Sequence, residues 1–249
     1  MRIAVMSDIH ANIEAFAAVL ADLDTQRPDD TINLGDVIGY GPNPEEAMAM
    51  LRARGIASVV GNHEQGVVDD KARAWFNPVS RKAVDITDTL ISDATRAFIR
   101  DMPQYILRHG CRFVHGCPPQ ATRLYLHQAT DAALARIFHR IAERITFVGH
   151  THDLELISWD GETITHTPIE APAAAARQTV LTLEPDQHHI VNVGAVGQPR
   201  DGDSRAKYVL WEPGARRLTV RFVPYDYRAT ARKILALGIP ETFAHRLGA

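Results

Sequence analysis

Five short polar clusters in the first two thirds of the 249-residue chain combine carboxylate, amide and imidazole side chains. These oxygen and nitrogen groups suit Mn, Fe, Zn and related divalent ions, whereas a Mg or Ca site would be richer in oxygen. Together the clusters contain more such side chains than one ion usually takes from a protein. The clusters are Asp8-Ile9-His10, Gly35-Asp36, Gly61-Asn62-His63-Glu64, His115-Gly116 and Gly149-His150-Thr151-His152.

Each cluster directly follows a short run that the sequence predicts to be a β-strand. Up to about residue 61 these runs alternate with helical patterns, which is typical of a parallel βαβ layer. Because the carboxyl ends of strands in an open α/β sheet converge on one crevice, we expect the five clusters to meet there. The five predicted strands are residues 3–6, 31–34, 57–60, 111–114 and 146–148.

Helical patterns occupy the segments between these strands. Apolar residues at helical spacing follow Asn12, whose side chain is suited to cap the first turn. Residues 65–102 are predicted to be mainly helical and to form an insertion over one side of the sheet. Within this insertion Trp75 and Phe76 either wall a substrate pocket or pack in the core.

The second half of the chain is predicted to be mainly antiparallel. Residues 154–159 and 162–166 flank Asp160-Gly161, a dipeptide typical of a two-residue type I′ hairpin. Neither a repeat nor a linker divides the chain, so we expect a single domain over residues 1–249, an α/β (α+β) fold of two stacked sheets with helices outside. Other predicted strands are residues 104–108, 180–183, 190–193, 208–211 and 218–223, with helices at 131–145 and in the C-terminal tail.

Composition is ordinary for a globular protein, with 45% hydrophobic residues and a net charge of −3. That charge provides no general attraction for nucleic acid or for an anionic membrane, and nucleic acid is not the expected partner. The two cysteines, Cys111 and Cys117, match neither a zinc nor a redox spacing and are expected to be reduced thiols. Because Asp8 follows so soon after the first residue, no secretory segment is expected, and the predicted location is cytoplasmic.

The ordered series Asp-x-His, Gly-Asp, Gly-Asn-His-Glu, His-Gly and Gly-His-x-His, from residue 8 to residue 152, resembles the calcineurin-like metallophosphoesterase superfamily, especially its small bacterial phosphodiesterases. The resemblance implies a four-layer αββα sandwich of two mixed sheets flanked by helices. It further implies a binuclear centre containing two divalent metal ions, Mn²⁺ foremost, with Fe, Zn, Ni or Co as alternatives. By the same resemblance, Asp8, His10 and His152 bind one ion, Asn62, His115 and His150 bind the other, and Asp36 bridges both.

Two ions in such a site lower the pKa of a shared water and hold the resulting hydroxide in line with phosphorus. The expected function is therefore hydrolysis of a phosphodiester, or of a small phosphomonoester, by in-line attack of that hydroxide. His63 is the expected catalytic residue, left unliganded beside Asn62 to protonate the leaving oxygen or stabilise its charge. A purely orienting role for His63 is the alternative.

Three further residues are candidates for binding substrate phosphate. Arg200 lies in a Gly-rich segment, residues 192–203, that resembles a strand-end loop of the small bacterial members, and its guanidinium either binds phosphate or pairs with a neighbouring aspartate. Asn12 and Tyr40 face the phosphate in one interpretation, and are a helix cap and a packing ring in the other. The remaining histidines match no motif and are assigned no role, and the pair His188-His189 is expected at the surface.

Two other classes of function remain beside hydrolysis of a small phosphate ester. One is a non-catalytic, metal-binding interaction module on the same fold, and the presence of every ligand together with His63 argues against it. The other is a nuclease, which would need a basic, aromatic-lined groove near the site. No oligomeric state is predicted from the sequence.

Overall fold

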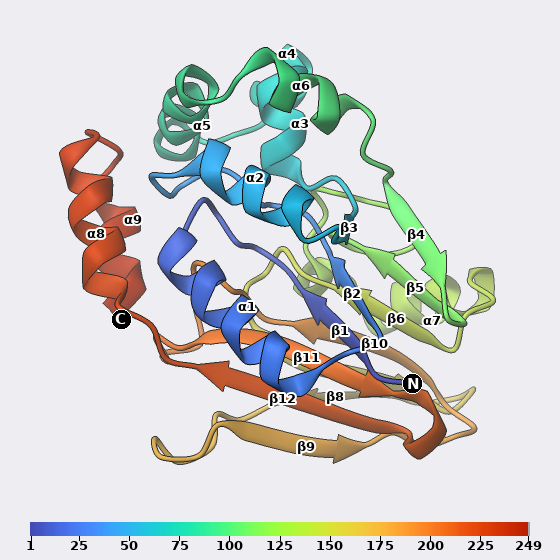
Figure 1. The fold of residues 1–249 in the computed structure, drawn as a ribbon. Helices are drawn as coiled ribbons and strands as arrows, with labels where there is room; N and C mark the ends of the chain where they lie inside the picture. Colours follow the sequence, from blue (N-terminus) through green and yellow to red (C-terminus); the bar gives the residue numbers. More distant parts are fainter. Residues whose placement is uncertain (249) are drawn as a thin grey trace.

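The computed structural model describes residues 1–248, and within them the strands form two stacked six-stranded sheets with helices on the outer faces (Figure 1). The first sheet has the order β3-β2-β1-β11-β12-β9 and the second β4-β5-β6-β10-β7-β8. The strands are β1 (Ile3–Met6), β2 (Asp30–Asn33), β3 (Ala57–Ser58), β4 (Tyr105–Arg108), β5 (Cys111–Val114), β6 (Ile145–Val148), β7 (Leu154–Trp159), β8 (Ile164–Pro168), β9 (Gln178–Thr182), β10 (His188–Val193), β11 (Ala206–Glu212) and β12 (Arg217–Val223).

Both sheets are mixed. In the first, β1 pairs in parallel with β2 and antiparallel with β11, so that Ile3 lies opposite Trp211. In the second, β10 pairs in parallel with β6 and antiparallel with β7. The parallel strands β1, β2, β3, β5 and β6 come from the first part of the chain, and the later strands extend both sheets mainly in the antiparallel sense.

The helices complete the layers. Helices α1 and α2 cover the outer face of the first sheet, and α7 covers the second (Figure 1). No helix within residues 1–248 has the length and apolar character needed to cross a membrane. The helices are α1 (Ile13–Gln26), α2 (Pro44–Ala53), α3 (Asn62–Val68), α4 (Asp70–Arg73), α5 (Pro78–Leu90), α6 (Asp93–Arg100), α7 (Asp131–Arg140), α8 (Tyr227–Ala236) and α9 (Thr242–His245), with 3₁₀ turns η1 (Leu126–Gln128), η2 (Pro213–Ala215) and η3 (Arg246–Gly248).

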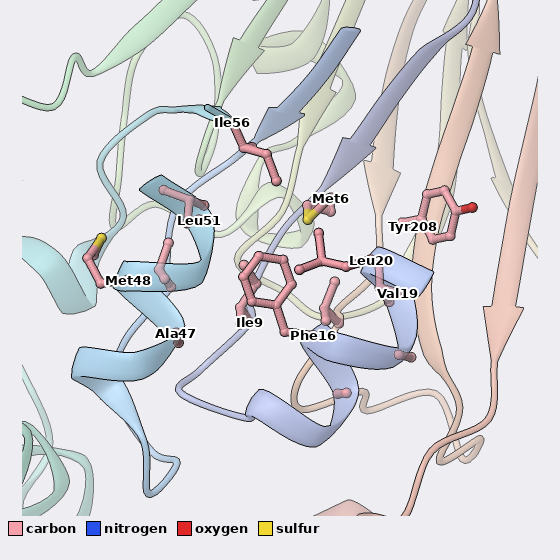
Figure 2. Packing of buried hydrophobic residues seen from close by; sticks show 14 of the residues in the cluster. Met6, Ile9, Phe16, Val19, Leu20, Ala47, Met48, Leu51, Ile56 and Tyr208 are labelled. Atoms are coloured by element: carbon pink, nitrogen blue, oxygen red, sulfur yellow. The ribbon is translucent and has the colours of Figure 1, made fainter. Parts of the chain in front are cut away.

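The alternation of side chains along β1 fills two separate layers of the core. Ile3 and Val5 belong to the cluster between the sheets, whereas Ala4 and Met6 belong to the cluster under α1. Figure 2 shows Met6 in that second cluster beside Phe16 of α1. Each fully buried side chain of this size stabilises the fold by about 1.5–3 kcal/mol relative to exposure. The end of β1, and with it Asp8, is therefore held firmly between two packed layers.

The predicted α/β sandwich of two mixed sheets is confirmed, and the region predicted as a helical insertion contains α3 to α6. Assignment of residues 1–249 to one domain stays a prediction. The helix predicted at 131–145 is shorter, because α7 ends at Arg140 and β6 already begins at Ile145.

The predicted two-residue hairpin is wrong. Trp159 pairs with Ile164, so residues 160–163 form a four-residue loop, in which Gly161 has a φ of 106°. The Asp160 carboxylate accepts hydrogen bonds from the backbone N–H groups of Glu162 and Thr163. This side chain stabilises a wider turn than the dipeptide alone indicated.

Candidate metal centre

The structure brings all seven predicted ligands together at the carboxyl ends of five strands. Each lies in the loop that follows β1, β2, β5 or β6, or at the start of α3 after β3, and all seven side chains are buried. Three overlapping groups of their ligand atoms, one including His63, lie close enough to hold a metal ion. The convergence of strand ends therefore assembles the clusters as expected.

One half of this cluster consists of Asp8, His10 and His152. The Oδ1 atom of Asp8 lies 3.5 Å from Nε2 of His10 and 3.2 Å from Nε2 of His152. The two Nε2 atoms lie 3.1 Å from each other. Asp8 Oδ1 is buried and has no hydrogen-bond partner within residues 1–248. An anionic oxygen and two ring nitrogens thus face one point.

The other half is centred on Nε2 of His115. This atom lies 3.1 Å from Oδ1 of Asn62 and 3.1 Å from Nδ1 of His150. Oδ2 of Asp36 lies 3.3 Å from His115 Nε2 and 3.8 Å from His10 Nε2. The Asp36 carboxylate therefore lies between the two halves.

The histidines of the cluster share one feature that defines their chemistry. Each ring has one nitrogen against a backbone carbonyl, which can only accept, so that nitrogen must donate an N–H. In a neutral ring the other nitrogen then carries no hydrogen, and its lone pair is directed into the cluster. The pairs are His10 Nδ1 with Ile38 O (3.2 Å), His115 Nδ1 with Leu34 O (2.8 Å), His150 Nε2 with Arg123 O (3.3 Å) and His152 Nδ1 with Gln198 O.

When all four rings are neutral, these lone pairs face each other at hydrogen-bond distance without a hydrogen between them. His10 and His152 do so at 3.1 Å, and His115 and His150 at 3.1 Å. Two acceptors at this distance repel, and a cation shared between them turns the repulsion into coordination. The residues therefore fit divalent metal ions.

Backbone strain is concentrated at the same residues. Ten residues other than glycine have positive φ in the described part of the chain, and five of them are predicted ligands. Such a conformation costs free energy for a residue with a Cβ and is common at functional sites. The five are Asp8 (56°), His10 (48°), Asp36 (52°), His150 (69°) and His152 (67°).

The protonation states of most of these groups suit metal binding. Burial opposes ionisation of Asp8, but His152 and His10 hold the pKa of that carboxyl well below its usual range. Burial lowers the pKa of His150 to about 3 and that of His152 to about 4, so both rings are neutral near pH 7. His115 differs: burial alone would lower its pKa, but the charge of Asp36 raises it to about 9. A metal ion would compete with a proton at His115.

His63 is buried beside the cluster, in a group with His10 and Asp36. Its backbone N–H donates to Asp36 Oδ1 at 2.9 Å, and its ring is packed edge-on by Tyr40 and Phe76. A Cβ at Gly39, whose φ is +87°, would lie 2.1 Å from Nδ1 of His63. Burial holds the pKa of His63 well below its usual value, so the ring is neutral.

Glu64 is a residue of the site to which sequence reasoning assigned no role. Its carboxylate accepts from the backbone N–H groups of Asp36 (2.7 Å), Ile38 (3.1 Å) and Gly61 (2.8 Å). Burial and the charge of Asp36 raise the pKa of Glu64 to about 7. Glu64 thus connects the loop after β2 to the start of α3. The sequence signal that could have revealed this role is a glutamate three residues after Gly61, the spacing of a capping box.

A cavity of about 570 Å³ adjoins the cluster, and Asn62 and His150 are in its lining. Arg200 and Tyr40 also line it. The Arg200 guanidinium donates to Gln198 Oε1 at 3.3 Å. Its alternative pairing with a neighbouring aspartate is wrong, because those carboxylates pair elsewhere: Asp201 with Lys207, and Asp203 with Arg205.

The other two substrate candidates have different surroundings. Tyr40 packs at 4.3 Å against Phe243 and borders the cavity, so it is both a packing ring and a wall. Asn12 caps α1 by accepting from the Ala15 N–H, and its amide donates to the carbonyl of Gly197. Asn12 is buried outside the cavity lining and its polar atoms are hydrogen-bonded, so its side chain acts as a helix cap and has no free group for phosphate.

One histidine prediction outside the cluster is wrong. His189 is 2% exposed rather than at the surface. Its two ring nitrogens lie 2.9 Å from the Ser158 hydroxyl and 3.0 Å from the carbonyl of Glu184. These partners satisfy the buried ring. The Ser158 hydroxyl comes from a distant position in the chain, which the His188-His189 pair does not reveal.

The sandwich and its buried cluster of carboxylate, amide and imidazole ligands define a metallophosphoesterase-type fold. The family model of the calcineurin-like phosphoesterase superfamily domain matches residues 1–214. The chain belongs to that superfamily.

Similar proteins include an uncharacterized protein of Methanocaldococcus jannaschii, MJ0912, which is 31% identical over 251 residues, covering 98% of this chain and 96% of that protein. Among solved structures, a metallophosphoesterase from Sphaerobacter thermophilus is 32% identical with a TM-score of 0.83, covering 100% of this chain and 99% of the other. The hypothetical protein PH1004 from Pyrococcus horikoshii is 16% identical with a TM-score of 0.78, covering 100% and 98%, and shares the fold.

Proposed function

We propose that the protein is a phosphoesterase that depends on two divalent metal ions, with Mn²⁺ as the preferred metal and a phosphodiester, or a small phosphomonoester, as substrate. The observation that carries the proposal is the set of four histidine rings, each fixed by a backbone carbonyl so that its other nitrogen faces the cluster. Membership of the phosphoesterase superfamily supports the reaction class.

The two halves of the cluster support two ions rather than one. We assign Asp8, His10 and His152 to the first and Asn62, His115 and His150 to the second. Asp36 is the proposed bridge, because its Oδ2 lies within 3.8 Å of a ring nitrogen from each half. When bound, such ions supply Lewis acidity that activates water and neutralises phosphate oxygens.

We assign His63 to the leaving oxygen. Its buried ring is packed by Tyr40 and Phe76, and a neutral ring carries one N–H that can donate to a developing negative charge. Arg200 is the proposed phosphate ligand, since its planar fork of donors lines the adjoining cavity. Tyr40 is proposed to border the bound ester.

The proposal is tested by stripping the protein of metal, reloading it with manganese, and measuring hydrolysis of bis-p-nitrophenyl phosphate and p-nitrophenyl phosphate. We expect manganese-dependent turnover that Asp36→Asn abolishes, and a fall of about 10²–10⁴-fold in kcat for His63→Ala. His139→Ala is the matched control, because His139 is an exposed histidine of α7 that packs on Trp159.

Metal content measured on the same samples separates the alternatives. Two ions per chain in the wild type and fewer in Asp36→Asn would support the binuclear assignment. Two ions with no turnover on either ester would instead favour a metal-binding interaction module, and no bound metal would contradict the proposal outright.

A further inference from the structure

The cavity beside the metal cluster is far larger than a phosphoryl group requires. At about 570 Å³ it falls within the range of pockets that enclose a whole small molecule. Asn62 and His150 line it on the side of the cluster, so a phosphate held at the cluster would extend its remaining part into the cavity. The chemistry of the remaining walls therefore indicates what that part is.

Three of the residues that line the cavity are positively charged. Arg123, Arg200 and Arg246 line the cavity, whereas no aspartate or glutamate is in its lining over the described residues. None of the three arginines forms an ion pair anywhere within residues 1–248. In a chain with a net charge of −3, three unpaired guanidinium groups around one cavity favour a second anionic group on the ligand.

A flat aromatic surface lies beside this charge. Trp75 lines the cavity and is 76% exposed, although tryptophan is usually well buried. The Arg123 guanidinium lies 5.2 Å from the centroid of its ring. An indole and a guanidinium presented together can hold a planar ring by stacking while binding phosphate nearby.

Another part of the cavity wall comes from α9 and η3 near the C-terminus. Thr242, Phe243 and Arg246 line the cavity, and all lie beyond residue 214, where the family match ends. Phe243 stacks on Tyr40, which in turn packs edge-on against His63. This part of the wall lies outside the segment that the family model matches, and it reaches the cluster through Tyr40.

We propose that this cavity binds a nucleotide carrying at least two phosphates, with its base on Trp75 and its second phosphate between Arg123 and Arg246. The inference rests on the proposed function, because it places the first phosphate at the metal cluster. It names the class of substrate that the phosphoesterase would select.

The test is a titration of the full chain with adenosine 5′-(α,β-methylene)diphosphate, whose carbon bridge prevents hydrolysis between the two phosphorus atoms. Tryptophan fluorescence is followed with manganese and again with a chelator. Of the three tryptophans, Trp159 and Trp211 are 7% and 4% exposed, so quenching should come from Trp75. We expect saturable quenching that Trp75→Phe removes. Adenosine and ribose 5-phosphate, which lack the phosphates and the base respectively, should bind at least tenfold more weakly.

The arginines are tested by Arg123→Met and Arg246→Met, which keep an unbranched apolar stem and remove the charged guanidinium. Each should weaken binding of the analogue about tenfold, since a charge-assisted contact to phosphate of this size is lost. The matched control is Arg228→Met, because Arg228 is an exposed arginine of α8 that lies over Tyr227 and does not line the cavity. This variant should bind like the wild type.

The outcomes separate this inference from the proposed function. Unchanged affinity in both arginine variants, or quenching that persists in Trp75→Phe, overturns the nucleotide site even if bis-p-nitrophenyl phosphate is hydrolysed. Arginine-dependent binding in chelator, together with no metal-dependent hydrolysis, supports the site and contradicts the phosphoesterase.

Discussion

At the scale of single residues, the candidate site depends on close contacts that leave no room for an added atom. Gly39 is the clearest case, because its missing Cβ makes space for the His63 ring. Gly110 has a similar positive φ, +71° against +87°, but a Cβ there would have no neighbour within 4 Å. Replacing Gly110 with alanine therefore tests the cost of the backbone conformation alone, whereas the same replacement at Gly39 adds the cost of a clash with His63.

We predict that Gly110→Ala lowers the free energy of unfolding by about 1 kcal/mol, the ordinary cost of a Cβ in the left-handed region. Gly39→Ala should cost more and should also reduce turnover, because His63 must move. Urea unfolding of both variants and hydrolysis of bis-p-nitrophenyl phosphate measure these effects. Equal stability and equal activity of the two variants would show that His63 does not depend on Gly39.

Residues with local signals were predictable, whereas residues defined by distant partners were not. Asp8, Asp36 and His115 follow recognisable strands, and their polar types stand out against apolar runs. Glu64 and His189 have partners far away in the chain, which the sequence alone does not bring near them. These partners are the backbone N–H groups of Asp36 and Ile38 for Glu64, and the Ser158 hydroxyl for His189.

At the scale of elements, α1 is attached to the first sheet by a partly buried ion pair as well as by apolar packing. Asp22 on α1 pairs with Arg221 of β12 at 2.8 Å and accepts from the Tyr208 hydroxyl at 2.6 Å. Asp24, on the same helix, pairs with Arg54 at 2.6 Å, but the side chains of both residues are exposed, Arg54 to 43% and Asp24 to 58%. These two aspartates provide a matched comparison.

We predict that Asp22→Asn lowers the free energy of unfolding at pH 7 by about 1–2 kcal/mol, whereas Asp24→Asn has no measurable effect. Although burial opposes it, the hydrogen bonds from Arg221 and Tyr208 lower the folded-state pKa of Asp22. Its contribution is therefore complete above the unfolded pKa of about 3.9 and is lost as the pH falls through the lower folded value. Urea unfolding at pH 7 and at pH 3 measures this, and a wild-type advantage that stays constant over this range would contradict it.

The order of strands was less predictable than their positions. The β-rich runs marked most strands, because apolar alternation is a local property. Insertion of β10 between β6 and β7, and of β11 beside β1, depends on pairing between segments far apart in the chain. The four-residue loop between β7 and β8 was missed because the Asp160 side chain supplies the turn's hydrogen bonds.

At the scale of the whole molecule, the cluster concentrates negative charge and facing lone pairs at the point where both sheets end. Asp8 and Asp36 are buried, and the facing ring nitrogens of His10 and His152 repel. Whatever cation binds there adds its binding free energy to the stability of the folded chain, because the unfolded chain has no such site.

We predict that the melting temperature rises with manganese concentration and falls on chelation. At a concentration one hundred times the dissociation constant the added stability is about 2.7 kcal/mol. Asp36→Asn should lose most of this gain, while Asp160→Asn, in an exposed loop, should retain it. Differential scanning calorimetry across a manganese series measures both, and a melting temperature insensitive to metal in the wild type would argue against a metal centre.

The pairing of β1 with β11 has a consequence for folding kinetics. Every proposed ligand precedes residue 153, yet the strand that leads to Asp8 gains its second neighbour only from residues 206–212. Such a non-local contact forms slowly. The two strands are separated by a long stretch of chain, and the entropic cost of bringing them together comes before any free energy is gained from their pairing. A nascent chain that already contains the complete ligand set therefore still has an unpaired edge on β1, and acquisition of metal should follow closure of the sheet rather than synthesis of the ligands.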